Sequence, residues 1–401
     1  MFRGRVQINK PKISQIQQGS SIYLSVASRL TRSCSALVMS APNPNPPVSG
    51  AGAGAGNGEG LPENLLAFFT QGLESYQLSN TTFRVLCSLS PTTSSPSSSS
   101  SNELLLAPPA PPTSHPRRLL VLDSSFNPPT LAHLRMALSA AAETAEATVP
   151  AKSPPPSPSQ PQPQSQRVLL LLATSNADKA PKPAAFPQRL AMMYIFAQDL
   201  LSAMAAPQSA EEAVQSGPAS TAVDIAVTTE PYFHSKSRAI AESDFYQQST
   251  AAAATATFEQ VYLTGFDTLI RIFNPKYYPG TGTGTGGSAM AAALDPFFAR
   301  SRLRVTMRTD ADWGDAEAQR KYVDGLRGHG DGDGGLVGVG WRAEWAEKVE
   351  MVEAGRRVGE EAAIVSSTKV RDAVVSRDWS LLRTLVSERM IEWIRREGLY
   401  S

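Results

Sequence analysis

Several features are scarce in this sequence of 401 residues, and each scarcity excludes a class of protein. Its two cysteines, Cys34 and Cys87, are too few for a disulfide framework or a thiolate zinc site, so a reducing compartment is expected. The formal net charge of +1 gives no excess that would indicate a nucleic acid or a membrane surface as partner. No apolar run approaches the roughly 18 residues that span a bilayer, so a soluble protein is predicted.

Acidic residues are absent from residues 1–58, which carry many serines and several basic residues. This composition is typical of a mitochondrial presequence. A disordered tail that happens to lack acids, or a start at Met39, explains it as well. We predict a disordered leader over residues 1–58, and we expect a cytoplasmic or nuclear protein, with a mitochondrial location as the alternative.

Proline, serine and glycine are bunched into a few segments instead of being spread along the chain. Such segments do not pack, so residues 59–401 are predicted to form one domain with flexible insertions. The Gly-rich run TGTGTGG, 281–287, lacks the lysine and the strand-to-helix setting of a phosphate loop, and it is interpreted as a linker. No metal site is predicted. The insertions are expected near residues 90–116, 146–166, 206–221, 279–292 and 325–340.

Between these segments, near-continuous apolar strands alternate with amphipathic helices. This alternation predicts an α/β fold, a Rossmann-like doubly wound parallel sheet with helices on both faces. Ligands of such sheets bind at the carboxyl ends of the strands. Strands are expected over 82–89, 117–123, 167–174, 223–229, 258–265, 302–308, 347–353 and just before Ser366, and helices over 61–76, 130–145, 186–204, near 237–243, over 267–273 and after Thr368.

Unusual polar residues follow two of these strands. The stretch LDSSFNPPTLAHLR, 122–135, places Thr130 and His133 on one face of a helix's first turn, where backbone N–H groups and the helix dipole favour an anion. The stretch VSSTKVR, 365–371, repeats the arrangement with three hydroxyls and Arg371. Helix capping and surface exposure would explain either motif alone. Two such sites in one sheet favour a ligand with several phosphates.

These motifs resemble those of a known family. SFNPPTLAH is similar to the GSFNPxTxxH signature, VSSTKVR to ISSTxxR, and LTGFDTLIRIFNPKYY to the GxDxL element of nucleotidyltransferases with an HxGH-type motif. Within that superfamily the chain most resembles nicotinamide mononucleotide (NMN) adenylyltransferases, in particular their divergent fungal-type relatives. The resemblance covers roughly residues 118–400, with the motifs in the family's order.

The resemblance implies roles for individual residues. Thr130, His133 and Arg371 would act on the phosphates during catalysis, and Asp267 would meet the ATP ribose. The residues expected to bind ATP are Ser125, Phe126, His133, Gly265, Asp267, Ser367, Thr368 and Arg371. Those expected to bind the mononucleotide are Ser125, Phe126, Lys179, Lys182, Arg189 and Tyr278.

The implied reaction joins ATP and NMN to give NAD and pyrophosphate, with Mg²⁺ accompanying ATP. Ser124, Tyr278 and the long low-complexity insertions motivate an alternative, a nucleotide-binding protein with little or no transferase activity that acts in regulation or protein quality control. Ser124 replaces a glycine that lets phosphate approach the backbone, and Tyr278 stands where many members have tryptophan. Ala132 replaces another glycine of the family pattern, which is a milder change. The sequence does not separate NMN from its nicotinate analogue, nor does it fix the oligomeric state.

Overall fold

The computed structural model describes residues 62, 64–91, 109–112, 116–146, 166–175, 184–206, 221–247, 258–278, 289–308, 314–328, 340–353 and 365–401. The expected leader and most of each expected insertion lie outside these ranges, so the predicted domain boundaries stay predictions. The chain divides into Met1–Gly58 and Glu59–Ser401, and every described residue belongs to the second unit.

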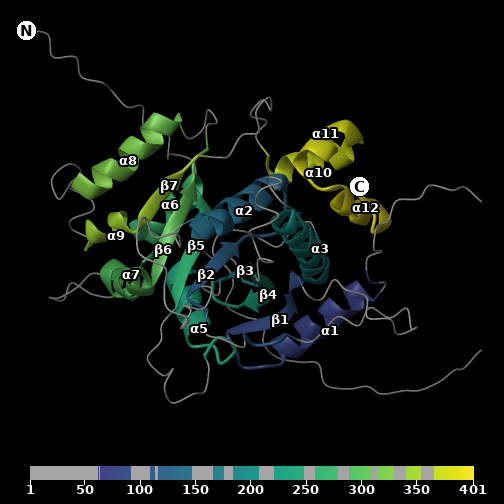
Figure 1. Cartoon of the computed structure of the whole chain (residues 1–401), viewed down its shortest axis with the longest axis horizontal. Helices are drawn as coiled ribbons and strands as arrows, with labels where there is room; N and C mark the ends of the chain where they lie inside the picture. Colours follow the sequence, from purple (N-terminus) through teal and green to yellow (C-terminus); the bar gives the residue numbers. More distant parts are fainter. Residues whose placement is uncertain are drawn as a thin grey trace, which may run out of the picture. The chain divides into compact units, whose positions relative to one another are not determined.

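A seven-stranded sheet forms the centre of this unit, in the order β1-β4-β3-β2-β5-β6-β7 (Figure 1). Strand β1 runs antiparallel to β4, and the other pairs are parallel. The chain steps outward from β2 to β4 and then returns to place β5 on the other side of β2. The reversal point between β2 and β5 is where doubly wound sheets bind ligands. The strands are β1 (Phe83–Leu89), β2 (Arg118–Asp123), β3 (Gln166–Ala173), β4 (Ala222–Thr228), β5 (Glu259–Gly265), β6 (Ser301–Thr306) and β7 (Val349–Val352).

Apolar residues on both faces of the strands explain why the sheet lies inside the protein. In β2, Leu119 and Val121 join one hydrophobic cluster while Leu120 and Leu122 join the other, because successive side chains point to opposite faces. All four are at most 1% exposed. Burying each contributes about 2 kcal/mol, so a strand with this composition is stable only between two layers of helices.

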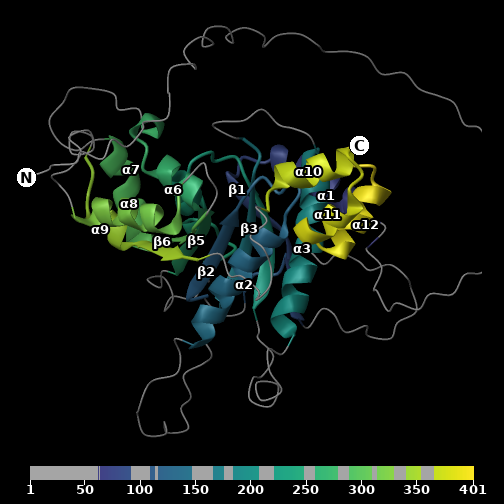
Figure 2. The same cartoon turned by 90° about the horizontal axis from the view of Figure 1, so that it is seen from above.

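The helices supply those two layers (Figures 1 and 2). One cluster packs against the helices α1 (Leu65–Gln77), α2 (Leu131–Glu146), α3 (Phe186–Ala205), α10 (Ser367–Val375), α11 (Trp379–Leu385) and α12 (Glu388–Arg396). The other cluster packs against α5 (Phe233–Ala241), α6 (Phe266–Ile272), α7 (Ala289–Arg300), α8 (Ala316–Gly328) and α9 (Glu344–Glu347), with the short 3₁₀ turn η2 (Pro275–Tyr277) after α6.

The doubly wound α/β fold predicted from the sequence is confirmed, with some local differences. The edge strand β1 is antiparallel, which makes the sheet mixed. Helices α7 and α8 were not expected; α7 contains Pro296 and begins inside the segment 279–292 that was expected to be an insertion. Helix α5 begins at Phe233, earlier than the expected 237. Residues 362–364, expected to belong to a strand, lie outside the described residues.

A charged group is buried near the amino ends of β3 and β4. Asp224 is 0% exposed, and its carboxylate accepts hydrogen bonds from Arg167 Nε at 2.8 Å and Arg167 Nη2 at 2.5 Å. The Ser88 hydroxyl donates to it at 2.6 Å and the Tyr246 hydroxyl at 2.9 Å. This cluster, called the Asp224 network below, joins three adjacent strands and satisfies its own charges.

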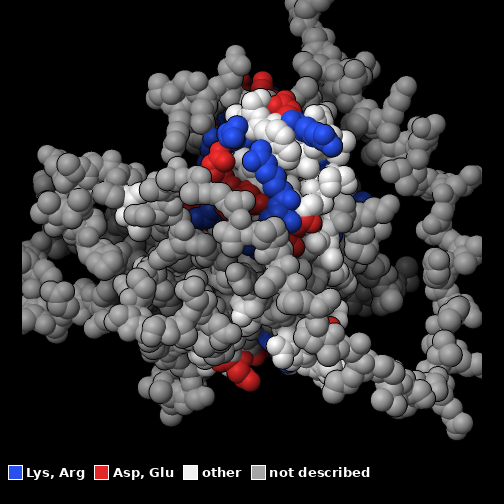
Figure 3. Space-filling model, turned by 90° about the vertical axis from the view of Figure 1, so that its right-hand side faces the viewer, with Lys and Arg blue, Asp and Glu red and all other residues white. Residues whose placement is uncertain are grey.

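Charges on the surface of the C-terminal helices are also paired. Figure 3 shows this side of the molecule, where Lys and Arg (blue) lie close to Asp and Glu (red) among uncharged residues. Arg383 Nε lies 3.0 Å from Glu388 Oε1, and Arg389 Nη1 lies 3.6 Å from Asp199 Oδ1. Surface pairs of this kind contribute at most about 1 kcal/mol. Among the helices of the described ranges, none is both long and apolar enough to cross a bilayer.

Candidate active site

The loop between β2 and α2 forms the centre of the candidate site. It leaves the sheet at Asp123, the last residue of β2, and contains a cis peptide bond between Asn127 and Pro128. Phe126 is fully buried and has φ of 45°, a left-handed conformation that costs a bulky residue about 1 kcal/mol or more. Its ring packs 6.0 Å from the ring of His133. Tertiary packing therefore holds this loop in a shape that its sequence alone disfavours.

His133 lies in the first turn of α2, with both ring nitrogens hydrogen-bonded. The Thr130 backbone N–H donates to Nδ1 at 3.1 Å, and Thr130 Oγ1 lies 2.8 Å from the same nitrogen. Because Nδ1 accepts, the ring proton of the neutral imidazole is on Nε2, which lies 3.0 Å from Ser124 Oγ. Burial lowers the pKa of His133 to about 4. At neutral pH His133 is therefore an uncharged donor through Nε2–H.

The second motif meets this loop from the far end of the sequence. Ser367 Oγ donates to the Pro128 carbonyl at 2.8 Å, and Arg371 Nη1 donates to the Asn127 carbonyl at 2.8 Å. Arg371 Nη2 also donates to Thr368 Oγ1 at 3.0 Å. Within the described ranges, this guanidinium donates to neutral oxygens and forms no ion pair with a carboxylate. The structure thus brings the two predicted phosphate motifs together.

Arg189 and Tyr400 complete this side of the site. Arg189 is 6% exposed, and its Nε donates to the Ala184 carbonyl at 2.8 Å. Burial lowers the pKa of Arg189; Tyr400 raises it and the nearby Arg371 lowers it. The Tyr400 hydroxyl donates to Asn127 Oδ1 at 2.8 Å, from a backbone with φ of 67°. Tyr400 was missed from the sequence because no local signal distinguishes it from other tyrosines.

Gly265 and Asp267 lie at the end of β5, the strand beside β2. Gly265 is the N-cap of α6, and a Cβ added there would come within 2.8 Å of Asp267 Oδ1, closer than real Cβ contacts. The glycine therefore leaves room for the carboxylate to turn toward the strand ends. Arg308, which follows β6 and was not singled out from the sequence, has its Nη1 3.7 Å from Asp267 Oδ1.

Tyr278 belongs to the other face of the sheet, where it packs in the second hydrophobic cluster. Its hydroxyl donates to the Ile272 carbonyl at 2.6 Å, and burial raises its pKa. The His234 ring lies 5.6 Å from it, and the Tyr232 ring stacks on His234 at 5.6 Å with an interplanar angle of 7°. We call Tyr232, His234 and Tyr278 the ring cluster. Of these three residues, only Tyr278 was predicted from the sequence to belong to the site.

A buried ion pair fixes the end of β2 to the helix that begins in the ring cluster. Lys236 Nζ of α5 lies 2.5 Å from Asp123 Oδ2, with side chains 6% and 8% exposed. Lys236 also lies over the Phe233 ring, 5.3 Å from its centroid. The pair was not predicted, because Lys236 stands among His234, Ser235, Ser237 and Arg238, a polar stretch that does not indicate burial.

The structure says less about the remaining residues that were expected in the site. Ser125 is exposed in the loop after β2, beside the site. Lys179 and Lys182 fall outside the described residues. Within the described ranges, no group of three or more His, Cys, Asp or Glu side chains is arranged to hold a metal ion.

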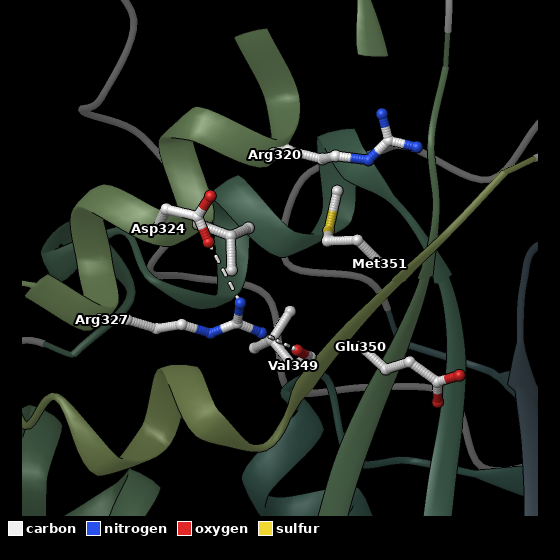
Figure 4. A pocket seen from close by; sticks show the side chains of 7 residues that line it. Arg320, Asp324, Arg327, Val349, Glu350 and Met351 are labelled. Carbon is white, nitrogen blue, oxygen red and sulfur yellow. Dashed lines mark hydrogen bonds and ion pairs between the residues drawn. The ribbon is translucent and has the colours of Figure 1, made fainter. Parts of the chain in front are cut away.

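A pocket elsewhere contains none of the expected site residues. It lies between α8 and β7 (Figure 4), where Arg327 Nη2 donates to the Val349 carbonyl at 2.7 Å and Nη1 lies 3.1 Å from Asp324 Oδ1. Arg320, also at this pocket, pairs with Glu353. Both guanidinium groups are therefore already engaged, and they support the edge strand.

The geometry around His133 and Arg371 favours one kind of ligand. Hydroxyls, a neutral imidazole N–H, an unneutralised guanidinium and the amino ends of α2 and α10 meet at the carboxyl end of β2. Each of these groups donates hydrogen bonds or carries positive charge, so together they form an anion site that fits phosphate groups.

Comparison with known proteins gives a sequence relative. No family model matches the chain. A protein of Schizosaccharomyces pombe described as "Putative nicotinamide mononucleotide adenylyltransferase" is 29% identical over 277 residues, which is 69% of this chain and 84% of the relative.

Solved structures give weaker similarities. Two structures of Plasmodium falciparum nicotinic acid mononucleotide adenylyltransferase, complexed with NaAD and with APC, cover 71% of this chain and 97% of their own. Their identities are 12% and 11% and their TM-scores 0.33 and 0.32, too low to carry an argument. The sequence relative confirms the resemblance predicted from the motifs: the chain is distantly homologous to the fission-yeast protein described in these words.

Proposed function

We propose that the chain transfers the adenylyl group of ATP to the 5′-phosphate of nicotinamide mononucleotide, giving NAD and pyrophosphate. The observation that supports this most is the Arg371 guanidinium, which reaches the loop after β2 with only neutral oxygens as partners in the described part of the chain. A permanent positive charge placed in this way has spare capacity for an anion. The sequence relative, whose description names the same mononucleotide, gives independent support.

The chemistry requires little from the protein beyond binding and orientation. The mononucleotide phosphate has its second pKa near 6, so it is largely a dianion at neutral pH. One of its oxygens attacks the α-phosphorus of ATP in line and forms the new O–P bond. The bond from the α-phosphorus to the bridging oxygen breaks, and pyrophosphate leaves with the electron pair. No protein nucleophile or general base is needed, in agreement with the lack of either in the motifs.

The residues of the site would then act by positioning and electrostatic stabilisation. His133 would turn its Nε2–H from the Ser124 hydroxyl to a phosphate oxygen, as a neutral donor. Arg371 would supply the positive charge, and Thr368 a further hydroxyl beside it. Asp267 would accept hydrogen bonds from the ATP ribose hydroxyls, in the space that Gly265 leaves open.

ATP would bring Mg²⁺ to the site as the metal complex of its phosphates. When bound, the ion would neutralise part of the negative charge on the triphosphate. Asp123 ends β2 and Asp267 follows β5, and Lys236 already pairs with Asp123. The residues present therefore fit a metal held chiefly by the nucleotide.

One observation favours the second candidate function, nucleotide binding without efficient transfer. The Ser124 hydroxyl, at a position where the family signature has glycine, occupies Nε2 of His133. A substrate phosphate must displace this hydroxyl before it can use the same nitrogen, and the serine side chain takes up space beside the backbone.

The test is to incubate the purified chain with ATP, Mg²⁺ and NMN and to assay NAD and pyrophosphate. We expect both products in equal amounts, and we expect His133→Ala to abolish turnover while circular dichroism and the melting temperature stay close to those of the wild type. ATP binding without product would favour the second candidate. Near-normal turnover in His133→Ala would exclude the role given to this histidine.

A further inference from the structure

One buried nitrogen in the ring cluster has no hydrogen-bond partner among the described residues. Nδ1 of His234 is shielded from solvent and makes no hydrogen bond to any described residue. Leaving a buried polar atom unsatisfied costs about 1–3 kcal/mol, and such atoms in folded proteins call for an explanation. The Tyr278 hydroxyl beside it is already used, since it donates to the Ile272 carbonyl. His234 therefore carries the spare hydrogen-bonding capacity of this cluster.

The surroundings of His234 keep its ring neutral and flat against its neighbours. The Tyr232 ring stacks on it and the Tyr278 ring packs at an interplanar angle of 41°. Burial lowers the pKa of His234; Arg238 lowers it further and Glu230 opposes this. Lys236, on the same helix, is paired with Asp123. A neutral imidazole between aromatic rings is a suitable neighbour for another flat, uncharged heteroaromatic ring.

We infer that His234 determines which pyridine mononucleotide the site accepts, by hydrogen-bonding through Nδ1 to the substituent on the pyridine ring and favouring the carboxamide of NMN over the carboxylate of nicotinate mononucleotide. The inference rests on the proposed function. Three observations carry it: the unpartnered nitrogen, the parallel packing of the Tyr232 ring, and the ion pair from Lys236, two residues along α5, to the strand that leads into the phosphate site.

The chemistry of the two substituents explains the preference. A carboxamide offers both a donor and an acceptor, so it satisfies Nδ1 in either tautomer of the neutral imidazole. A carboxylate offers only acceptors and must lose its hydration on entering the cluster. A neutral Nδ1–H can donate to a carboxylate, but only a protonated imidazole balances its negative charge, and the burial of His234 disfavours protonation at neutral pH.

The test compares kcat/KM for NMN with kcat/KM for nicotinate mononucleotide, using the full chain with ATP and Mg²⁺. We expect the wild type to prefer NMN. His234→Phe keeps a flat ring but removes the nitrogen, and it should reduce the preference about tenfold, the value of one good hydrogen bond. His234→Asn loses the ring but keeps a polar group near the position of Nδ1, so it should retain the preference. General losses of folding cancel in the ratio of two substrates.

A pH series adds a readout that a purely structural role would not change. As the pH falls below the ordinary histidine value of 6.5, His234 gains charge and the ratio should shift toward nicotinate mononucleotide. The substrate phosphates titrate alike in both mononucleotides and cancel. The shift should be absent in His234→Phe.

Failure of this inference and failure of the proposed function give different results. Dinucleotide formation with an unchanged substrate ratio in His234→Phe would overturn the role of His234 alone. If no dinucleotide forms, equilibrium titration of each mononucleotide still compares the two ligands. Equal affinity of the wild type for both would then reject the inference, and binding of neither would reject both proposals.

Discussion

The Asp224 network and the candidate active site each contain an arginine, and they differ in what that arginine meets. In the Asp224 network, Arg167 lies against a fully buried carboxylate that also accepts from Ser88 and Tyr246. In the candidate active site, Arg371 meets the Asn127 carbonyl and the Thr368 hydroxyl. The first cluster lies near the amino ends of its strands and the second at the carboxyl end of β2.

The difference indicates what each cluster does. A buried charge that is paired with an opposite charge is already neutralised. Removing one member of the pair mainly lowers the free energy of unfolding. A charge that is held only by neutral oxygens stays available to a ligand. Removing it mainly weakens ligand binding and slows catalysis. The predictions below change one cluster at a time and measure both properties.

The largest expected effect is on stability, in the Asp224 network. Asp224→Ala leaves the Arg167 charge buried without its partner and should lower the free energy of unfolding by about 4 kcal/mol. Urea unfolding at pH 7.5 measures this. The activity per folded molecule should stay within about twofold. A stable Asp224→Ala protein with lost activity would reverse the assignment of the two clusters.

Next comes the matched change in the candidate site. Arg371→Ala should reduce kcat/KM for NAD formation by about 100- to 1000-fold, which corresponds to about 3 kcal/mol of transition-state stabilisation. The free energy of unfolding should change by less than about 1 kcal/mol. Arg371→Lys keeps the charge but loses the paired hydrogen bonds, so an intermediate loss is expected. A loss of stability as large as that in Asp224→Ala would show that Arg371 is structural instead.

The third prediction concerns pH. Because burial lowers the pKa of His133 from 6.5 to about 4, the unfolded chain takes up a proton in this interval before the folded chain does. Stability present above pH 6.5 should therefore decrease by about 3 kcal/mol as the pH falls toward 4. Urea unfolding across this range measures the decrease, and His133→Gln should make it smaller by that amount. An equal decrease in the variant would assign it to other groups.

The smallest expected effect is at Ser124. Ser124→Gly frees Nε2 of His133 and opens space beside the backbone, so kcat should rise about threefold. This rise corresponds to less than about 1 kcal/mol of activation free energy. Steady-state rates at saturating ATP and NMN measure this. Ser380→Gly, an exposed serine outside the site, is the control for the general effect of glycine in place of serine. A fall in kcat specific to Ser124→Gly would mean that the hydroxyl helps to orient His133.

Much of the fold could be predicted because many strands and helices follow from the residues within each segment. Strands β2 and β3 are continuous apolar runs, and only a sheet buried on both faces accommodates such runs. The turn residues after β2 and the hydroxyls before α10 were predicted to meet at the sheet edge. Contacts of Ser367 and Arg371 with the loop after β2 confirm this proximity, whereas the roles of these residues stay predictions.

The rest of the fold and of the site depends on contacts between residues that are far apart in the sequence. Helix α8 was missed because its apolar residues are sparse, and Val323 and Leu326 are buried only through tertiary packing. Tyr400 meets Asn127, and His234 packs against Tyr278, across segments distant in sequence. The antiparallel direction of β1 could not be read from its residues either, because its direction depends on the path of the chain between β1 and β2.

The contacts of Ser367 and Arg371 with Pro128 and Asn127 span 239 and 244 positions. During synthesis, the loop after β2 leaves the ribosome long before the residues that complete the phosphate site. A nascent chain that ends before α10 lacks the Arg371 charge, and it also lacks the part of one helical layer that α10, α11 and α12 supply. Completion of the core and completion of the site therefore both wait for the C-terminal helices, and only a chain made through them can bind as the finished protein does.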